Sequence, residues 1–316
     1  MENDNILVSI CTLAYNHEPY IKQCLDGFIM QKTNFKYEVL INDDASTDKT
    51  ASIIREYAKE YPEIIKPIFQ EENQHSQGVA ISASFLYPRA QGKYIAKCEG
   101  DDYWTDPLKL QKQVDFLEAN ENYSTVFHPV DWFEQASGNI LPGAYGPPFI
   151  KEYYDTDDLL EHSNFLPTCS VIFRNREDLL PLPEWYFQCP FGDFPLHVIN
   201  SLHGKIGMIN ESMALYRRHQ GGLHGGNTEK DNIEKLIVCY HLIGENNGFC
   251  EKKSYKIHLY SLHRRLYQLY TDSNQKKKAV FNLKVANEIY SIKRYYLKLF
   301  FIYIPIIKKF LEKVIK

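Results

Sequence analysis

Hydrophobic positions near the start of the chain follow two different periods. Residues 6–13 (ILVSICTL) are almost continuously apolar and β-branched, which is typical of a strand buried on both faces of a parallel sheet. From Tyr20 onward the apolar positions follow helical spacing, and Pro19 suits the first turn of a helix. The pattern therefore predicts a strand followed by a helix.

The same alternation of strand and helix repeats along the first third of the chain. Further strands are predicted at 37–42, 64–69 and 93–98, and further helices at 46–60, at 79–90 and from Asp106 and Pro107 onward. Successive βαβ units indicate an α/β fold with a mainly parallel, doubly wound sheet. Ligands of such sheets lie beyond the carboxyl ends of the strands, so the segments to search are 14–17, 42–48 and 98–106.

The pattern becomes mixed beyond about residue 123. Shorter strands are predicted at 125–130, 170–174, 205–210 and 213–218, with a Pro/Gly-rich loop at 142–148 and a helix beginning near Asp193. Beyond Gly226 the chain has a helical pattern and is rich in Lys and Tyr. We therefore predict an α/β domain over residues 1–225 and a helical, basic extension over residues 226–316.

Charge is distributed unevenly between these parts. Residues 251–316 hold 16 Lys/Arg against 4 Asp/Glu, whereas residues 1–250 hold 20 against 36. An acidic body argues against nucleic acid as a partner, because the phosphate backbone attracts clustered Lys and Arg. The seven cysteines contain no CxxC pair, and the N-terminus lacks the basic and apolar segments of a signal peptide. These features predict a cytoplasmic protein without a disulfide framework or a structural zinc site.

Two acidic clusters follow predicted strands. Residues 42–48 (NDDASTD) come after the second strand, and residues 99–102 (EGDD) come after the fourth. Taken alone, each cluster also fits a solvated turn or a helix cap. Three carboxylates within four residues nevertheless suit a hard cation such as Mg²⁺ or Mn²⁺. Both clusters lie where the fold places ligands, and this coincidence favours a functional site.

Five ordered motifs resemble those of glycosyltransferase family 2, whose members have the GT-A fold. The motifs are residues 8–16 (VSICTLAYN), 42–48 (NDDASTD), 92–102 (GKYIAKCEGDD), 192–193 (GD) and 216–219 (YRRH). The resemblance implies a Rossmann-like, mainly parallel sheet flanked by helices. It also implies an inverting enzyme that uses Mn²⁺ or Mg²⁺ and a nucleotide-sugar donor, with a UDP-sugar favoured. The implied acceptor is a glycan or a lipid-linked glycan, in bacterial-type synthesis of cell-surface glycans.

The resemblance also implies roles for residues on the donor side. Thr12, Ala14 and Tyr15 would bind the nucleotide, with Ala14 and Tyr15 lining the pocket for the base. Asp44 would accept a hydrogen bond from the base. Asp101 would hold the ribose, the sugar or the metal ion.

Three more positions match the family's chemical machinery. Asp102 would bind the metal ion on the diphosphate, and His219 resembles the late motif that closes over the ion and the diphosphate. Asp193 matches the catalytic base that takes the proton from the acceptor hydroxyl. Because the ion stabilises the charge of the leaving diphosphate, one carboxylate suffices as the base. Each residue also has a structural interpretation, since Asp193 could cap a helix and His219 could be a surface histidine.

The motifs depart from the usual family pattern at three positions. Glu99 stands where the acidic motif often begins with Asp, and Ala45 replaces a common Gly. Gly192 precedes Asp193 where an acidic residue is usual, which leaves the predicted base without a neighbouring carboxylate. We expect structural roles for four histidines without metal-ligand spacing, namely His17, His75, His128 and His162.

The end of the chain has an amphipathic, basic pattern. Its apolar stripe consists of Ile306, Ile307, Phe310, Leu311, Val314 and Ile315, and its other positions include Lys308, Lys309, Lys313 and Lys316. The apolar run 299–307 is far shorter than the roughly 18–20 residues that span a bilayer. Such a helix suits the anionic surface of a membrane, and here it would lie on the cytoplasmic face. Packing on the body or on a second subunit is the alternative.

Two other functions stay open at the level of the sequence. A nucleotidyltransferase that acts on sugar phosphates could use a similar sheet and ion, but such enzymes usually show a Gly-rich, basic phosphate loop. The segment after the first strand, TLAYNHEP, contains no such loop. A sugar-nucleotide binding protein without catalysis would keep Asp44 and Asp102 but would not need Asp193.

Overall fold

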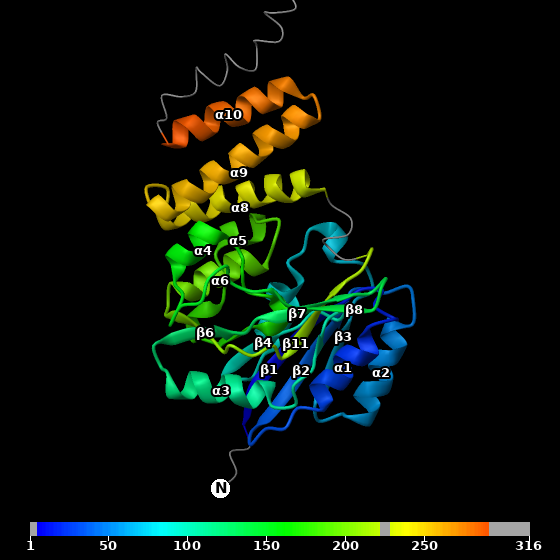
Figure 1. Cartoon of the computed structure of the whole chain (residues 1–316). Coiled ribbons are helices and arrows are strands. Elements are labelled where there is room, and N and C mark those ends of the chain that lie inside the picture. Colours follow the sequence, from blue (N-terminus) through cyan, green and yellow to red (C-terminus); the bar gives the residue numbers. More distant parts are fainter. Residues whose placement is uncertain (1–4, 222–227, 291–316) are drawn as a thin grey trace, which may run out of the picture. The chain divides into compact units, whose positions relative to one another are not determined.

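The computed structural model describes residues 5–221 and 228–290, and these form two compact units (Figure 1). The first unit contains the described residues up to 188 and those from 192 to 221. The second unit contains residues 189–191 and 228–290. The predicted amphipathic helix at 306–316 lies outside the described residues.

A seven-stranded sheet organises the first unit, in the order β10-β6-β9-β4-β1-β2-β3. Its strands are β1 (Ile6–Ala14), β2 (Lys36–Asp43), β3 (Ile65–Phe69), β4 (Tyr94–Lys97), β6 (Tyr123–Phe127), β9 (Ile172–Arg174) and β10 (Lys205–Met208). The pairs β10-β6, β4-β1, β1-β2 and β2-β3 are parallel, and β9 runs antiparallel to both β4 and β6. The prediction of an α/β fold with a mainly parallel sheet is confirmed.

Three helices alternate with the first strands as the periodicity predicts. They are α1 (Ile21–Ile29), α2 (Thr50–Glu60) and α3 (Lys109–Ala119). Side chains alternate between the two faces of a strand, so Val8 and Ile10 of β1 share a face, as do Val39 and Ile41 of β2. These four residues are fully buried in one hydrophobic cluster with Phe28 of α1. Figure 1 shows α1 and α2 beside each other against this part of the sheet.

Two predicted segments differ in the structure. The predicted helix at 79–90 is a short π-helical turn, η2 (Ser82–Leu86), followed by a 3₁₀ turn, η3 (Tyr87–Arg89). Pro88 has no backbone N–H and cannot donate the hydrogen bond to the carbonyl of residue 84 that a regular α-helix would need there. The predicted loop at 142–148 instead overlaps a strand, β8 (Asn139–Tyr145), at the edge of a second sheet. An edge strand tolerates proline, so Pro142 misled the prediction.

The second sheet has the order β5-β11-β7-β8. Its other strands are β5 (Tyr103–Trp104), β7 (Val130–Glu134) and β11 (Ala214–Arg218). β5 follows the acidic turn at 99–102 directly, and it pairs with β11 through Trp104 and Ala214. This pairing brings the late motif at 216–219 to the acidic turn.

The remaining elements of the first unit are short. They are α4 (Thr156–His162), α5 (Glu184–Gln188), α6 (Asp193–Ser201) and the 3₁₀ turns η1 (His75–Gln77), η4 (Thr168–Ser170) and η5 (Glu177–Leu179). The predicted helix beginning near Asp193 is confirmed as α6. No helix was predicted at α4, whose first turn is closed by a capping box between Asp155 and Asp158.

The described residues of the second unit form three helices, namely α8 (Glu229–Asn247), α9 (Lys253–Asp272) and α10 (Lys276–Tyr290). Figure 1 shows α9 between α8 and α10. Arg265 of α9 forms a bidentate ion pair with Glu229 of α8, at 2.6 and 2.8 Å. The hydroxyl of Tyr270 donates to the carboxylate of Glu234 across the same pair of helices. None of the described helices combines the length and the apolar composition needed to cross a membrane.

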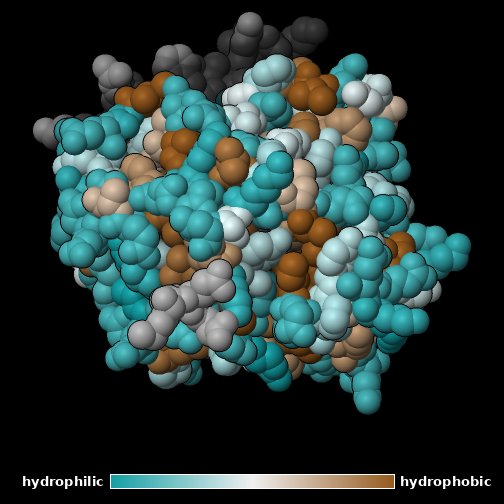
Figure 2. Space-filling model, turned by 90° about the horizontal axis from the view of Figure 1, so that it is seen from below, coloured by the Kyte–Doolittle hydropathy of each residue, from teal (hydrophilic) through white to brown (hydrophobic). Residues whose placement is uncertain are grey.

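Figure 2 shows the molecule from below, where hydrophobic residues reach the surface in small groups separated by hydrophilic ones. Separate exposed hydrophobic side chains are ordinary on soluble protein surfaces. The hydrophobic groups on this face are therefore of the ordinary kind, and they mark no particular docking surface there.

Candidate active site

The loops after β1 and β2 are joined by hydrogen bonds at the carboxyl edge of the sheet. The two strands are parallel neighbours, and Ala14 at the end of β1 is level with Asp43 at the end of β2. The backbone N–H of Asn16 donates to Ser46 Oγ at 2.9 Å, and the N–H of Thr47 donates to Asn16 Oδ1 at 2.8 Å. Residues distant in sequence thus form one continuous rim above the sheet.

Of the residues predicted to bind the nucleotide, Tyr15 is exposed and Thr12 and Ala14 are buried. Tyr15 is 44% exposed at the end of β1, so its ring is accessible to a planar ligand. Thr12 is fully buried within β1, and its hydroxyl has no hydrogen-bond partner in the described part of the chain. Ala14 is buried and accepts a hydrogen bond from the N–H of Asp44 at 2.9 Å.

The carboxylate of Asp44 already holds a neighbouring loop. Its Oδ1 accepts from the N–H of Gln74 at 2.8 Å, and its Oδ2 accepts from the N–H of His75 at 3.0 Å. The adjacent Asp43 differs, because Ser46 N–H donates to its Oδ2 at 3.2 Å while its buried Oδ1 has no partner among the described residues. Asp43 is thus a candidate acceptor that the motifs did not single out, although it lies in the same acidic cluster.

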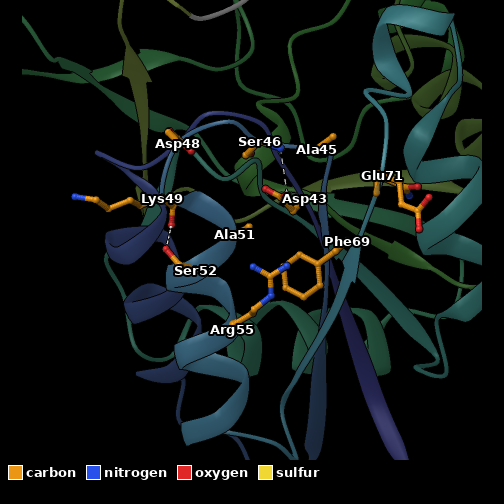
Figure 3. Close-up of a pocket in the computed structure, with 11 residues that line it drawn as sticks. Asp43, Ala45, Ser46, Asp48, Lys49, Ala51, Ser52, Arg55, Phe69 and Glu71 are labelled. Carbon is orange, nitrogen blue, oxygen red and sulfur yellow. Dashed lines mark hydrogen bonds between the residues drawn. The ribbon is translucent and has the colours of Figure 1, made fainter.

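A hollow of about 450 Å³ lies beside the turn after β2 (Figure 3). Its wall includes Arg55, whose guanidinium lies over the ring of Phe69 at 4.1 Å from the centroid. Asp43 contributes to the lining, whereas none of the eight residues predicted for the site does so. The residues predicted for the site therefore lie outside this hollow.

The turn after β4 brings two histidines to one carboxylate. Asp101 Oδ2 lies 3.0 Å from His219 Nε2 and 3.8 Å from His17 Nε2. A side chain at Gly100 would place its Cβ 2.8 Å from His17 Nδ1, so the close approach requires glycine. The structure thus brings together Asp101 and His219, both predicted for the site. It adds His17, for which the sequence indicated only a structural role although it lies in the loop after β1.

The neighbouring Asp102 lies in a different environment. It is 2% exposed, and its Oδ1 accepts from the N–H of Arg217 at 2.8 Å. Burial and the charge of Asp101 raise the pKa of Asp102 well above its usual value. Burial also opposes ionisation of Asp101, but the hydrogen bond from His219 and the nearby imidazoles outweigh it, so its pKa is lowered. Asp102 therefore faces the backbone of β11, whereas Asp101 faces the histidines.

Glu99, at the start of the same turn, also has a shifted pKa. Its Oε1 lies 3.8 Å from Nζ of Lys97. Burial raises the pKa of Glu99 to about 7, although the charge of Lys97 acts in the opposite direction. The turn thus contains three carboxyl groups whose ionisation is interdependent.

Asp193 occupies the first turn of α6, and Gly192 occupies the N-cap position. The amide of Asn164 donates to Asp193 Oδ2 at 2.7 Å, and the N–H of Phe194 donates to Oδ1 at 2.8 Å. His197, one turn further along, is buried, and burial lowers its pKa to about 4. The carboxylate therefore has two neutral donors, one of which, Asn164, carried no signal in the sequence.

The acidic turn suits an ion that is shared with a ligand. No group of three or more His, Cys, Asp or Glu with the geometry of a metal site occurs within residues 5–221 and 228–290. Mg²⁺ in particular is commonly held by one or two carboxylates together with substrate phosphates. Asp101 Oδ2 and His219 Nε2 lie 3.0 Å apart and are hydrogen-bonded to each other here. An ion completed by a diphosphate would replace this hydrogen bond and take both atoms as ligands.

Comparisons with known sequences identify relatives over most of the chain. The family described as "Glycosyl transferase family 2" matches residues 9–179. A protein of Mycobacterium tuberculosis, described as uncharacterized, is 39% identical over 234 residues, which cover 71% of this chain and 62% of that protein. The chain thus spans less than two-thirds of the length of this relative. The Escherichia coli enzyme WfaP is named UDP-Glc:alpha-D-GlcNAc-diphosphoundecaprenol beta-1,3-glucosyltransferase. It is 28% identical over 173 residues, which cover 54% of this chain and 61% of WfaP.

Comparisons with solved structures reveal the same fold at low sequence identity. Staphylococcus aureus TarS 1-349 in complex with UDP-GlcNAc has a TM-score of 0.57 at 16% identity, covering 90% of this chain and 92% of that one. The mannosyltransferase PcManGT of Pyrobaculum calidifontis, in complex with GDP-Man and Mn²⁺, has a TM-score of 0.54 at 16% identity, covering 91% and 76%. At such identities the likeness concerns the fold alone.

Proposed function

The chain belongs to glycosyl transferase family 2, and from this premise we propose that it transfers a sugar from a nucleotide-diphosphate donor to a hydroxyl group with inversion. The observation that carries this proposal is the meeting of Asp101 and His219, which are 118 residues apart in the sequence and 3.0 Å apart in the structure. The site lies at the carboxyl edge of a mainly parallel sheet, where such folds bind ligands. The carboxylates gathered at this edge are stabilised by a ligand that supplies positive charge or hydrogen-bond donors.

For the donor we propose a UDP-sugar. The exposed ring of Tyr15 would stack on the base, and the base N–H would donate to Asp44, with Asp43 as a second acceptor beside it. Thr12 and Ala14 would shape the floor of this pocket from within β1. TarS was solved in complex with UDP-GlcNAc and WfaP is named for UDP-Glc, and these two proteins support the choice of a UDP-sugar.

For the ion, Mn²⁺ or Mg²⁺, we propose Asp101 and His219 as the holding residues. Asp102 supports the turn by accepting the N–H of Arg217, and this contact makes it less suited to bind the ion directly than the sequence suggested. When bound, the ion would stabilise the negative charge of the leaving diphosphate. Arg217 donates from its Nε to the carbonyl of Asp101 at 2.7 Å, which keeps the turn in place.

For the base we propose Asp193. Its position in the first turn of α6 favours the ionised carboxylate, because the amino end of a helix stabilises negative charge. The carboxylate would take the proton of the acceptor hydroxyl as that oxygen attacks the anomeric carbon from the face opposite the diphosphate. One base is enough, since the diphosphate leaves without being protonated.

For the acceptor we propose a glycan or a lipid-linked glycan of the cell surface. WfaP is named for a diphosphoundecaprenol-linked acceptor, and it is similar to more than half of this chain. The basic C-terminal segment, which lies outside the described residues, would bring the enzyme to the anionic, cytoplasmic face of a membrane where such lipids occur. Cytoplasmic location and peripheral membrane binding are parts of the same proposal.

The decisive experiment measures release of UDP from UDP-Glc and UDP-GlcNAc by the full chain, with and without Mn²⁺. Asp193→Asn should lower turnover by roughly the hundred- to ten-thousandfold typical of a lost general base, while UDP affinity stays unchanged. Asp178→Asn is the matched control, because Asp178 is exposed and pairs with Arg176 and His203, neither of which is proposed for the site. Binding of UDP without any turnover would favour a binding protein, and full turnover by Asp193→Asn would refute the base.

A further inference from the structure

The geometry points to Asn164 as the positioning residue for Asp193, an inference that rests on the proposed role of Asp193 as the base. Asn164 Nδ2 donates to Asp193 Oδ2 at 2.7 Å. Asn164 Oδ1 accepts from the N–H of Leu166 at 3.1 Å. Because Leu166 N–H can only donate, this second contact determines which end of the amide faces Asp193. The amide therefore presents a donor, and not its carbonyl, to the carboxylate.

The backbone around Asn164 is held in a strained conformation. Ser163, the residue before it, has φ 64° and ψ −158°, in a region that is almost exclusive to glycine. The N–H of Ser163 donates to Leu159 O at 2.9 Å and so ends α4. Phe165 and Leu166 follow with 4% and 0% exposure, which anchors the other side. Such strain persists only where the surroundings impose it, so α4 and the core together hold Asn164 toward α6.

The electrostatic surroundings of Asp193 explain why a neutral donor matters there. The titratable groups whose ionisation is influenced by this carboxylate include Glu99, His197, Tyr87 and Tyr145. His197 is neutral near pH 7 because burial lowers its pKa to about 4, so it supplies no positive charge. Lys97 lies 3.8 Å from Glu99 and offsets that carboxyl group. The hydrogen bond from Asn164 is therefore the neutral side-chain contact that orients the carboxylate of Asp193.

The position before Asp193 strengthens the same argument. Gly192 stands where the family usually has an acidic residue, so the base has no adjacent carboxyl group to orient it. Asn164 reaches Asp193 from 29 positions earlier in the chain and takes over this orienting role. We expect its loss to affect the chemical step and its pH dependence rather than donor binding.

The test is the pH profile of UDP release from a UDP-sugar by Asn164→Ala and Asn164→Asp in the full chain. In Asn164→Ala, kcat should fall about 10- to 100-fold with donor KM within about twofold, because a small misplacement of a catalytic group has effects of this size. The acidic limb of kcat/KM should move up by about one pH unit, since the ionised base loses a donor. Asn164→Asp keeps the acceptor for Leu166 N–H but adds a second carboxyl group beside Asp193. The acidic limb of its kcat/KM profile should therefore move to still higher pH, and its activity should recover at high pH.

A matched control separates positioning from general stability. Asn120 is also partly buried, and its Nδ2 donates to Phe116 O at 2.7 Å without contacting Asp193. Asn120→Ala should lower the melting temperature while leaving the acidic limb in place. An unmoved limb in both Asn164 variants would overturn the proposal. If Asp193→Asn kept its turnover, the proposed base would fail as well, whereas an inactive Asp193→Asn with unmoved Asn164 profiles would refute only the positioning role.

Discussion

The two acidic turns at the carboxyl edge of the sheet resemble each other in sequence and differ in how their carboxylates are paired. In the turn after β2, both oxygens of Asp44 accept backbone N–H groups of the 74–75 segment. In the turn after β4, Asp102 accepts one backbone N–H, while Asp101 faces the imidazoles of His17 and His219. The first turn is thus held largely by backbone N–H groups of a neighbouring segment, and the second depends on side chains that can change their charge.

This difference is visible in the ionisation of the second turn. Hydrogen bonding and nearby imidazoles lower the pKa of Asp101 against the effect of burial, whereas burial raises the pKa of Asp102 and brings that of Glu99 to about 7. Three carboxyl groups so close together cannot all be ionised without a compensating charge. The turn after β2 therefore provides a rigid frame, and the turn after β4 provides a place where a cation is electrostatically favourable.

The largest effect should come from the second turn. Asp101→Asn should reduce Mn²⁺-stimulated UDP release by at least about a hundredfold, because the proposed ion loses the carboxylate proposed to hold it. Asp102→Asn should mainly lower the melting temperature, since Asp102 packs against the backbone of β11. Initial rates against Mn²⁺ concentration, together with thermal unfolding, distinguish the two variants. An Mn²⁺ response that survives in Asp101→Asn and disappears only in Asp102→Asn would restore the assignment first suggested by the motif.

The next effect should come from the first turn. Asp44→Ala should lower the free energy of unfolding by about 1–3 kcal/mol, because the N–H groups of Gln74 and His75 lose their acceptor. It should also weaken UDP binding, since the base loses both its acceptor and the frame around it. Urea unfolding and calorimetry with UDP measure the two effects. A variant with normal stability and weaker UDP binding would mean that Asp44 serves the ligand alone.

A smaller effect concerns the pH dependence of stability in the metal-free protein. Because the folded state raises the pKa of Glu99 from 4.5 to about 7, it binds this proton more tightly than the unfolded chain does. The resulting stabilisation is complete below about pH 4.5 and is lost as the pH rises through 7. Glu99→Gln should remove this pH-dependent contribution to the free energy of unfolding. We expect a contribution on the order of 1–2 kcal/mol, less than the full pKa shift would give, because the side chain is partly exposed and solvent screens its charge. Urea unfolding in EDTA at pH 5 and pH 8 tests it, and an unchanged difference between wild type and variant would contradict it.

The smallest effect should arise at Ala45 in the first turn. Its φ of 59° is left-handed, where a side chain costs about 1 kcal/mol, and this explains why glycine is common at this position in the family. Ala45→Gly should leave the free energy of unfolding unchanged or raise it by less than about 1 kcal/mol, because the added flexibility of the unfolded chain offsets part of the gain. A clear loss of stability would show that the Ala45 methyl group makes a contact that outweighs the strain.

The sequence by itself determined the α/β class, the order of the first strands and helices, and the two acidic turns. These features depend on local periodicity and on short motifs, which a single segment of the chain already contains. The apolar run at 6–13 predicted β1, and the helical spacing from Tyr20 predicted α1. Local signals failed where they conflicted with tertiary pairing, as at β8, where Pro142 and Gly143 lie in an edge strand.

Only the tertiary structure decided which side chains meet. The family motifs assigned Asp101 and His219 to one site, but only the structure shows that His17, from a third segment, lies beside the same carboxylate. The contact between Asn164 and Asp193 likewise depends on the strained turn after α4 and on the start of α6. The physical reason is that secondary structure follows from near neighbours along the chain, whereas hydrogen-bond partners and pKa shifts depend on which segments the folded chain packs together.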